Sequence, residues 1–203
     1  MIEVEIRGEL TEAQWDSLRA FLDKEGTPEK EQERDMILLR DYPGYHHNPT
    51  KRETDMRIKV TNGLCEFVLK KNAADGNRGR TEIILPVGEK AASNDEAKET
   101  FAKLREIVRA FGCRNGLWMH RVTFTYRYHN IEWALIRARR DDGSEVVFYE
   151  AEKEVENTSA VESAHKDLVD QAHTLDLPVL ERDKDMSAFI YMLDREVNKE
   201  IEL

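Results

Sequence analysis

Hydrophobic and polar residues alternate strictly at the start of this chain. From residue 2 to residue 7 the even positions hold Ile, Val and Ile, and the odd positions hold Glu, Glu and Arg. A period of two is typical of a strand that buries one face. We therefore predict an N-terminal strand with one apolar face and one fully charged face.

The pattern then changes to a helical one. Thr11 and Gln14 have the spacing of a capping box, and apolar residues recur at helical intervals from Trp15 to Leu22, before Gly26. These features predict an amphipathic helix over residues 12–24.

Short strands return between Asp35 and Val87. The segments DMILL, DMRIKV, CEFVLKK and RTEIILPV are separated by pieces rich in turn residues, which are YPGYHHNP, TNG and DGNRG. This arrangement predicts a meander of antiparallel strands. The dense charges between Glu29 and Arg34 indicate a solvated connector ahead of it.

A second helix separates this meander from a second group of strands. Ser93 and Glu96 form another capping-box pattern, and the apolar stripe that follows ends at Gly112. The segments VTFTYRY, EWALIRARR and EVVFYEAEKEV supply further strands, the last two joined by an Asp-Asp-Gly-Ser hairpin signal. Apolar spacing predicts two final helices, over residues 159–174 and 187–201.

About eight strands are enough to close a sheet, and closure removes exposed edges. Because several strands carry charges opposite their apolar face, we expect a solvated interior. We predict the α+β class: a closed eight-stranded antiparallel β-tunnel, or barrel, with helices packed outside, as a single domain over residues 1–203.

Composition excludes some classes of partner. Lys and Arg total 31 against 41 Asp and Glu, so the net charge of −10 argues against DNA binding. The sequence has neither a leader-like start nor an apolar run of membrane-span length, from which we expect a cytoplasmic protein without a membrane partner. Its two cysteines, Cys65 and Cys113, are too few for a disulfide framework.

Charged residues recur on the strands at alternate positions. Three such charged faces occur along the chain, of which the first and last are mainly acidic and the second is mainly basic. The positions are Glu3, Glu5 and Arg7; Arg57, Lys59, Lys70, Arg80 and Glu82; and Glu150, Glu152 and Glu154. If these faces share one interior, carboxylates suited to Mg²⁺ or Mn²⁺ lie beside cations suited to phosphate oxygens.

The ordered segments resemble the CYTH superfamily, also called triphosphate tunnel metalloenzymes. EVEIR resembles the E-x-E-x-K signature, with Arg in place of Lys, and RIK, FVLKK and RTE resemble the L-R-I-R, L-T-L-K and R-x-E strands. FYEAE resembles the late F-x-E-x-E strand, and it precedes a helix that ends in LDLP. DMSAFIYML resembles the S-Y-x-x-L segment near the C-terminus.

This resemblance implies a tunnel in which basic residues hold a small-molecule triphosphate and carboxylates hold Mg²⁺ or Mn²⁺, in a monomer or homodimer. The implied metal ligands are Glu3, Glu5, Glu82, Glu150 and Glu152. The implied phosphate-binding residues are Arg7, Arg57, Lys59, Lys70, Arg80 and Arg121, with Arg127 an equal match to Arg121 because it has the same strand parity. The implied catalytic residues are Glu3, Glu5 and Lys59.

Two positions depart from the family pattern. The second acid expected after R-x-E is Ile84, and ALIRARR offers no Asp where the family has Leu-Asp. The leading interpretation is a metal-dependent triphosphatase acting on tripolyphosphate, thiamine triphosphate or a nucleotide. Two alternatives remain: a class IV adenylyl cyclase, and a non-catalytic module that binds a nucleotide or polyphosphate.

Overall fold

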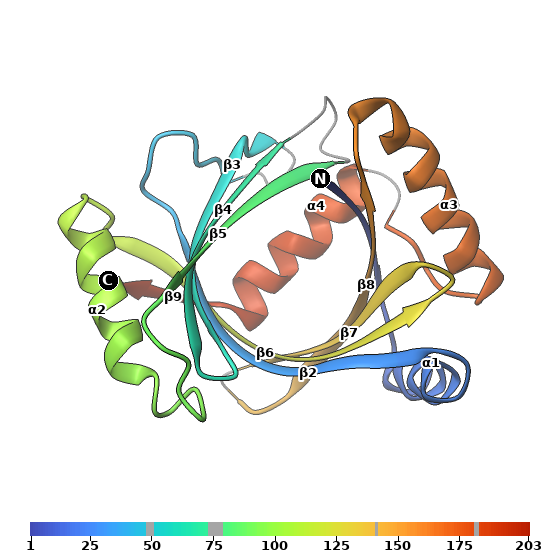
Figure 1. Cartoon of the computed structure of the whole chain (residues 1–203), viewed down its shortest axis with the longest axis horizontal. Coiled ribbons are helices and arrows are strands. Elements are labelled where there is room, and N and C mark those ends of the chain that lie inside the picture. Colours follow the sequence, from blue (N-terminus) through green and yellow to red (C-terminus); the bar gives the residue numbers. More distant parts are fainter. Residues whose placement is uncertain (48–50, 73–78, 141, 181–182) are drawn as a thin grey trace.

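Nine antiparallel strands form one sheet that closes on itself in the computed structural model of the chain (Figure 1). The structure describes residues 1–47, 51–72, 79–140, 142–180 and 183–203. The strands are β1 (Ile2–Glu9), β2 (Thr27–Leu39), β3 (Thr54–Thr61), β4 (Leu64–Asn72), β5 (Arg80–Val87), β6 (Asn115–Tyr128), β7 (Ile131–Arg139), β8 (Glu145–Val155) and β9 (Lys199–Glu202).

The sheet order is β2-β3-β4-β5-β1-β8-β7-β6-β9, and β2 also pairs with β6. That additional pairing closes β1 to β8 into a ring, which confirms the predicted tunnel architecture. The extent of strand pairing differs around the ring. β2 and β6 pair over most of their length, from Thr27↔Arg127 to Leu39↔Gly116, whereas β1 meets β5 at the single pair Glu3↔Arg80.

Three helices cover the outer face of the ring. The even residues of β1 pack against α1 (Glu12–Glu25) and α3 (Val161–Thr174) in one apolar cluster, which includes Val4, Trp15 and Leu168. On the opposite side, α2 (Lys98–Ala110) packs through Leu104 onto the outer residues of β3 and β4. These contacts are the reason that one face of each strand is apolar in the sequence.

Of the two predicted capping boxes, the one at Thr11 and Gln14 forms, whereas at Ser93 the Glu96 carboxylate accepts from the amide of Ala92 instead of that of Ser93. Thr11 and Gln14 bond reciprocally at the start of α1. Ser93 Oγ accepts from the Glu96 amide at 3.3 Å, and a turn follows before α2 begins at Lys98.

The C-terminal region differs from the prediction in position and in structure. The helix α4 (Asp183–Met192) continues as a π-helical turn over Leu193–Val197, and Lys199–Glu202 then forms β9, so Ile201 is not in a helix. Its residue Phe189 packs on Phe148 and Ile136, which share the inner face of the ring. Helix α4 therefore lies inside the ring rather than outside it (Figure 1).

The prediction of a solvated connector between Glu29 and Arg34 is wrong, because these residues are part of the strand β2. These residues belong to β2 and pair with β6 along the register from Lys30↔Thr125 to Arg34↔Arg121. The error has a physical cause, because cross-strand pairing satisfies backbone groups whatever the side chains are. The first half of β2 is exposed and charged, so its composition is that of a loop although its backbone is paired.

Turns that connect the strands follow the predicted chemistry where they are described. Asn62 and Gly63 both have positive φ, at 45° and 83°, between the paired residues Thr61 and Leu64. This is the two-residue turn that Asn-Gly favours. Residues 48–50 and 73–78, and residue 141 of the second hairpin signal, lie outside the described residues.

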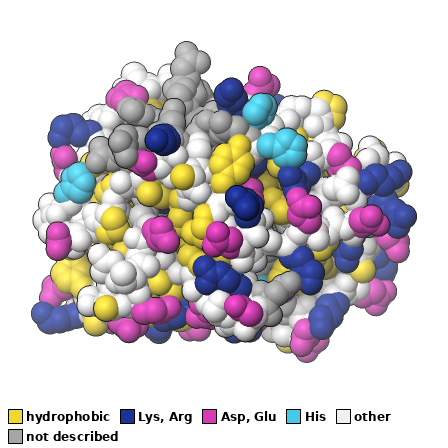
Figure 2. Space-filling view, turned by 180° about the vertical axis from the view of Figure 1, so that it is seen from behind, with side chains coloured by type: hydrophobic (Ala, Val, Ile, Leu, Met, Phe, Trp, Pro, Cys, Tyr) yellow, Lys and Arg dark blue, Asp and Glu magenta, His cyan; other side chains and the backbone are white. Residues whose placement is uncertain are grey.

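The outer surface carries mixed charge. Figure 2 shows basic and acidic side chains interspersed over the face that it presents, with hydrophobic groups between them. In the described parts of the chain, no helix is long and apolar enough to pass through a membrane.

An ion pair lies on the outer face where the ring closes. His120 of β6 is directly opposite Asp35 of β2, its Nδ1 lies 2.9 Å from the Asp35 carboxylate, and its ring stacks on Trp118. The hydrogen bond with Asp35 raises the pKa of His120, although partial burial opposes the shift.

This pair predicts how the stability of the ring depends on pH. A histidine whose pKa is raised on folding stabilises the fold fully below its unfolded pKa, and the benefit is lost as the pH rises through the folded pKa. We therefore compare the unfolding free energy of the wild type with that of His120→Gln. The difference between the two proteins should be about 1 kcal/mol larger at pH 5.5 than at pH 9. Urea denaturation at the two pH values measures it.

The control is His129→Asn, since His129 is exposed on the turn after β6. Its difference from the wild type should not change with pH in the same way. A difference for His120→Gln that is equal at both pH values would show that the pair does not strengthen the seam.

Candidate functional site

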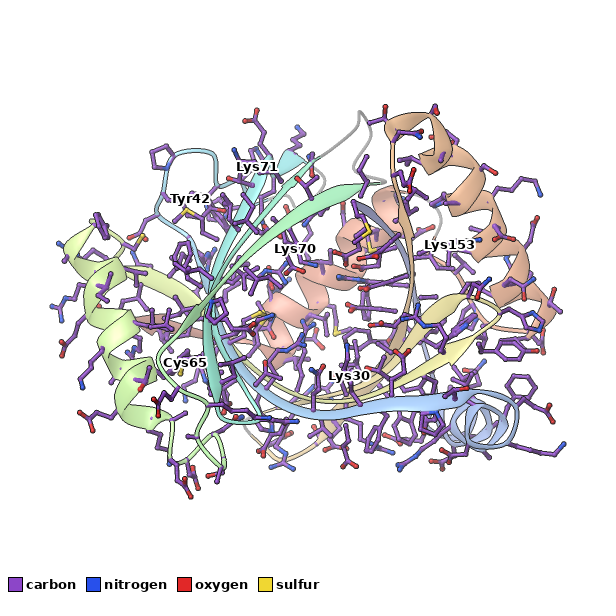
Figure 3. All side chains as sticks on the ribbon, in the orientation of Figure 1. Lys30, Tyr42, Cys65, Lys70, Lys71 and Lys153 are labelled. Carbon is purple, nitrogen blue, oxygen red and sulfur yellow. The ribbon has the colours of Figure 1, made fainter. Side chains whose placement is uncertain are left out.

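The inner face of the ring is densely charged. Alternate residues of seven strands place these side chains on it, namely Glu3, Glu5, Arg7, Arg34, Asp55, Arg57, Lys59, Glu66, Lys70, Arg80, Glu82, Arg121, Glu150 and Glu152. Lys70 projects into the ring in Figure 3, whereas Cys65 of the same strand lies on the α2 side. Lys153 points away toward α3, where it pairs with Asp167.

Three carboxylates meet where β1 and β8 pair. Glu3, Glu5 and Glu152 each place a carboxylate oxygen within 4.8 Å of the others, and Glu5 lies directly opposite Glu152 in the register. Burial, together with the charges of Glu5 and Glu3, raises the pKa of Glu152 to about 10. Burial would also raise the pKa of Glu5, but the neighbouring cations Arg7, Lys70 and Arg80 lower it to about 2.

These three residues fit a divalent cation of the hard type. Mg²⁺ and Mn²⁺ take oxygen ligands and keep waters or substrate oxygens in the remaining positions, so a few carboxylates suffice. Burial and the charges of Glu5 and Glu3 favour the protonated form of Glu152, and a bound cation would favour its carboxylate. The predicted ligands Glu82 and Glu150 lie outside this group of three. Glu82 is 3.9 Å from Lys70 and Glu150 is 2.9 Å from Arg7, the same cations that pair with Glu3 and Glu5.

Two of the predicted basic residues connect to the acidic cluster. Arg7 pairs with both Glu5 and Glu150, and these carboxylates hold its pKa above its usual value despite burial. Lys70 donates to Glu3 at 3.2 Å. Burial opposes the charge of Lys70, but Glu3 raises its pKa.

Two further basic residues share one partner. Arg57 and Arg80 each donate to Oδ2 of Asp55 at 2.8 Å, although they come from β3 and β5. The Nε of Arg57 is buried and has no hydrogen-bond partner among the described residues, and its Nη1 lies 3.9 Å from the sulfur of Met36. Arg57 therefore retains unused donors on the inner face.

Arg121 is a buried cation without a carboxylate within 4.0 Å in the described parts of the chain. Its Nη2 contacts the Met119 sulfur at 3.6 Å, its guanidinium lies 5.4 Å from the centre of the Phe148 ring, and its Nε is unpartnered. Burial lowers the pKa of Arg121 to about 10. A buried charge ordinarily has a partner, so this one leaves room for an anion.

Arg127, which the sequence could not distinguish from Arg121, lies elsewhere. It is exposed toward the end of β6, where it pairs with Glu29 at 3.1 Å and Glu132 at 3.1 Å. Its strand parity is that of Arg121, but its position along the strand takes it out of the buried group. The structure therefore brings Arg121, and not Arg127, to the other basic residues.

Lys59 occupies the side of the inner face next to β2. It donates to Glu66 at 3.2 Å, and burial, with the nearby charge of Arg34, lowers its pKa. The sequence grouped Lys59 with Glu3 and Glu5 as catalytic residues. Among the described residues, Lys59 pairs with Glu66 and has no ion pair with either of them.

Comparison with known structures identifies the architecture. The PH1819 protein from Pyrococcus horikoshii OT3 aligns with a TM-score of 0.67 at 17% identity, over 93% of this chain and 98% of that chain. A putative adenylate cyclase from Vibrio parahaemolyticus gives 0.55 at 11% identity, over 92% and 98%. The putative adenylyl cyclase HpAC1 from Hippeastrum, described as having a dominant triphosphatase activity, gives 0.52 at 15% identity, over 88% and 89%.

The chain has the CYTH triphosphate-tunnel fold. The sequence itself matches no family model and no curated protein. At these identities the similarity establishes the tunnel architecture, and the chemistry has to be argued from the side chains.

The two departures from the family pattern lie on apolar parts of the tunnel interior. Ile84 is opposite Val68 on β4. The inner residues of β7 are Ala134, Ile136 and Ala138, which pack on the helix α4. Among the described residues, Glu3, Glu5 and Glu152 form the one group able to hold a metal ion in this tunnel.

Four charged residues of the tunnel interior were not predicted. Asp55, Arg34, Glu66 and Arg52 contact the predicted residues or their partners. Asp55 shares the parity of Arg57 and Lys59 on one strand, so alternation could have indicated it. Arg52 precedes β3, where no periodicity applies.

The acidic cluster predicts metal binding that depends on Glu152. We expect Mn²⁺ to raise the melting temperature of the wild type. The variant Glu152→Gln should bind Mn²⁺ at least about tenfold more weakly, because a ligand is lost. Without metal the variant should melt near the wild type, since the amide replaces a carboxyl group of raised pKa. Differential scanning fluorimetry over a Mn²⁺ titration measures both.

The matched control is Glu154→Gln, two residues along β8 and exposed. Mn²⁺ should stabilise this variant as it does the wild type. Equal stabilisation of Glu152→Gln would remove that residue from the metal site.

Proposed function

We propose that this protein binds a metal-complexed triphosphate inside its tunnel and hydrolyses it. The observation that carries this proposal is Arg121, a partly buried residue with a buried Nε, which contacts a thioether and an aromatic ring and has no ion pair among the described residues. Such a cation is stabilised by an anion from outside the chain. Arg57, which retains unused donors, supports the same conclusion.

The separation of charges indicates what kind of anion fits. Arg57, Arg80 and Arg121 lie on β3, β5 and β6, and the three clustered carboxylates lie on β1 and β8, where Arg7 and Lys70 offset part of their charge. A triphosphate that arrives with a divalent cation presents negative oxygens to the first group and its metal to the second. A simple carboxylate ligand would satisfy one group and be repelled by the other.

The residues also suggest how the reaction proceeds. A divalent cation held by Glu3, Glu5 and Glu152 would polarise the phosphoryl group and lower the pKa of a bound water. Arg121 and Arg57 donate to phosphate oxygens and stabilise the charge that develops in the transition state. Lys59, whose pKa burial lowers, is the cation best suited to share its proton with the departing phosphate oxygen.

Substrate identity is open to a direct experiment. Tripolyphosphate, thiamine triphosphate and ATP are each incubated with the protein and Mg²⁺ or Mn²⁺, and released phosphate and cyclic AMP are measured. We expect metal-dependent phosphate release that EDTA abolishes. Cyclic AMP from ATP would identify a cyclase, and tight binding without any product would identify a non-catalytic module.

A second prediction tests the phosphate contact itself. Arg121→Met removes a charged donor, so the affinity for tripolyphosphate should fall roughly 10- to 150-fold, as expected for one charged hydrogen bond. The unliganded protein should be as stable as the wild type or more so, because an unpaired buried cation is lost. Isothermal titration calorimetry and urea denaturation measure the two effects.

Arg127→Met is the control of the same chemistry on the same strand. Its triphosphate affinity should stay within about twofold of the wild type, since its charge is already paired with Glu29 and Glu132. Equal losses in the two variants would show that Arg121 makes no specific contact.

A further inference from the structure

Asp55 is the one acidic residue that the described structure records as buried, and its side chain is 3% exposed. It lies at the start of β3, two residues before Arg57 and on the same inner face. Three guanidiniums surround it. Burial alone would raise the pKa of Asp55, but Arg57, Arg80 and Arg52 hold it well below its usual range, so the group is a carboxylate.

The two oxygens of this carboxylate face different kinds of partner. Oδ1 accepts from Nη1 of Arg52 at 3.1 Å. Arg52 is itself fixed, because its Nε donates to the carbonyl of His46 at 3.0 Å and its guanidinium lies 4.9 Å from the centre of the Tyr45 ring. Oδ1 is therefore tied to the scaffold.

Oδ2 faces the basic residues of the tunnel. It accepts from Nη2 of Arg57 and from Nη1 of Arg80, both at 2.8 Å. Arg80 reaches this oxygen from β5, across the intervening strand β4. Each arginine gives one nitrogen to Asp55, and a guanidinium has five N–H donors, so most of each fork stays available.

We propose that Asp55 is a positioning residue that sets the orientation of Arg57 and Arg80 for a triphosphate, an inference that rests on the proposed function. A free arginine side chain loses rotamer entropy when it binds a ligand, and a fixed one has already lost it. The carboxylate also keeps the guanidiniums of Arg57 and Arg80 together across the intervening strand in the absence of ligand, which like charges otherwise oppose.

A positioning role and a purely electrostatic role for Asp55 predict opposite changes in triphosphate affinity when this residue is replaced. Asp55 is a negative charge beside a binding site for a polyanion, so removing that charge should tighten triphosphate binding if only charge matters. If Asp55 positions the arginines, removal should weaken binding in spite of the more favourable charge. The direction of the change distinguishes the two.

The test uses two variants of the full chain, with tripolyphosphate as the probe in calorimetry. Asp55→Asn removes the charge and presents an amide group to one or more guanidiniums. Asp55→Glu keeps the charge and moves the carboxylate by one methylene group. We expect both to bind tripolyphosphate about tenfold or more weakly than the wild type, corresponding to part of two charged hydrogen bonds.

A general structural role is separated by Mn²⁺ binding without triphosphate. The acidic cluster of Glu3, Glu5 and Glu152 does not contact Asp55 in the described structure, so Mn²⁺ affinity should stay within about twofold in both variants. Glu154→Gln is the charge control, and it should bind tripolyphosphate at least as tightly as the wild type.

The outcomes decide between the explanations. Unchanged or tighter tripolyphosphate binding by Asp55→Asn, or unchanged binding by Asp55→Glu, would overturn the positioning role and leave the proposed function intact. Parallel losses of Mn²⁺ and tripolyphosphate binding would also overturn it, in favour of general distortion. If Asp55→Asn does not fold, Asp55→Glu alone decides. A wild type that binds no tripolyphosphate would overturn the proposed function, and this inference with it.

Discussion

Burial of charge inside a closed ring is the constraint on which the rest of this structure depends. When eight strands close, every second residue of each strand faces one enclosed space, and here many of those residues are charged. Most are compensated by neighbours, as Arg7 is by Glu150 and Arg57 by Asp55. The exceptions are Arg121 on one side and Glu152 on the other, which have no ion pair among the described residues, and they indicate where a ligand would complete the charge balance.

The outer and inner faces divide stability from function. The outer cluster that joins α1 and α3 to β1 and β8 is apolar and fully buried, so it supplies the burial that stabilises the ring. Inside, one apolar cluster joins β7, β8 and α4, and a smaller one joins Met36 and Leu38 of β2 to Leu117 and Met119 of β6. This allocation lets part of the interior remain charged without loss of the fold, because closure does not depend on the interior side chains being apolar. Uncompensated charge is expected at a functional site and is costly elsewhere.

Alternation predicted which side chains share the inner face better than it predicted where the strands and helices begin and end. The parity of Glu3, Glu5 and Arg7 placed them correctly on one face, since parity is a property of a single strand. Strand parity does not tell how far along the tunnel a residue lies. Arg121 and Arg127 were therefore equivalent in the sequence, although they lie in different surroundings. The partners of Arg57 and Arg80 were equally inaccessible, because Arg80 reaches Asp55 across an intervening strand. Similarly, an apolar stripe predicts that α4 is buried, but not on which side of the sheet.

Charge compensation also explains why a shared tunnel fold need not imply a shared reaction. With Ile84 in place of an acid and an apolar inner face on β7, the described interior holds one group of three carboxylates within 4.8 Å of one another, at Glu3, Glu5 and Glu152. In the proposed reaction, these three residues would hold one divalent cation. Transition-state charge would then be stabilised chiefly by the arginines. Their preorganisation matters more in such a tunnel than in one with two metal sites, which is the physical reason for a buried carboxylate to hold two of them in place.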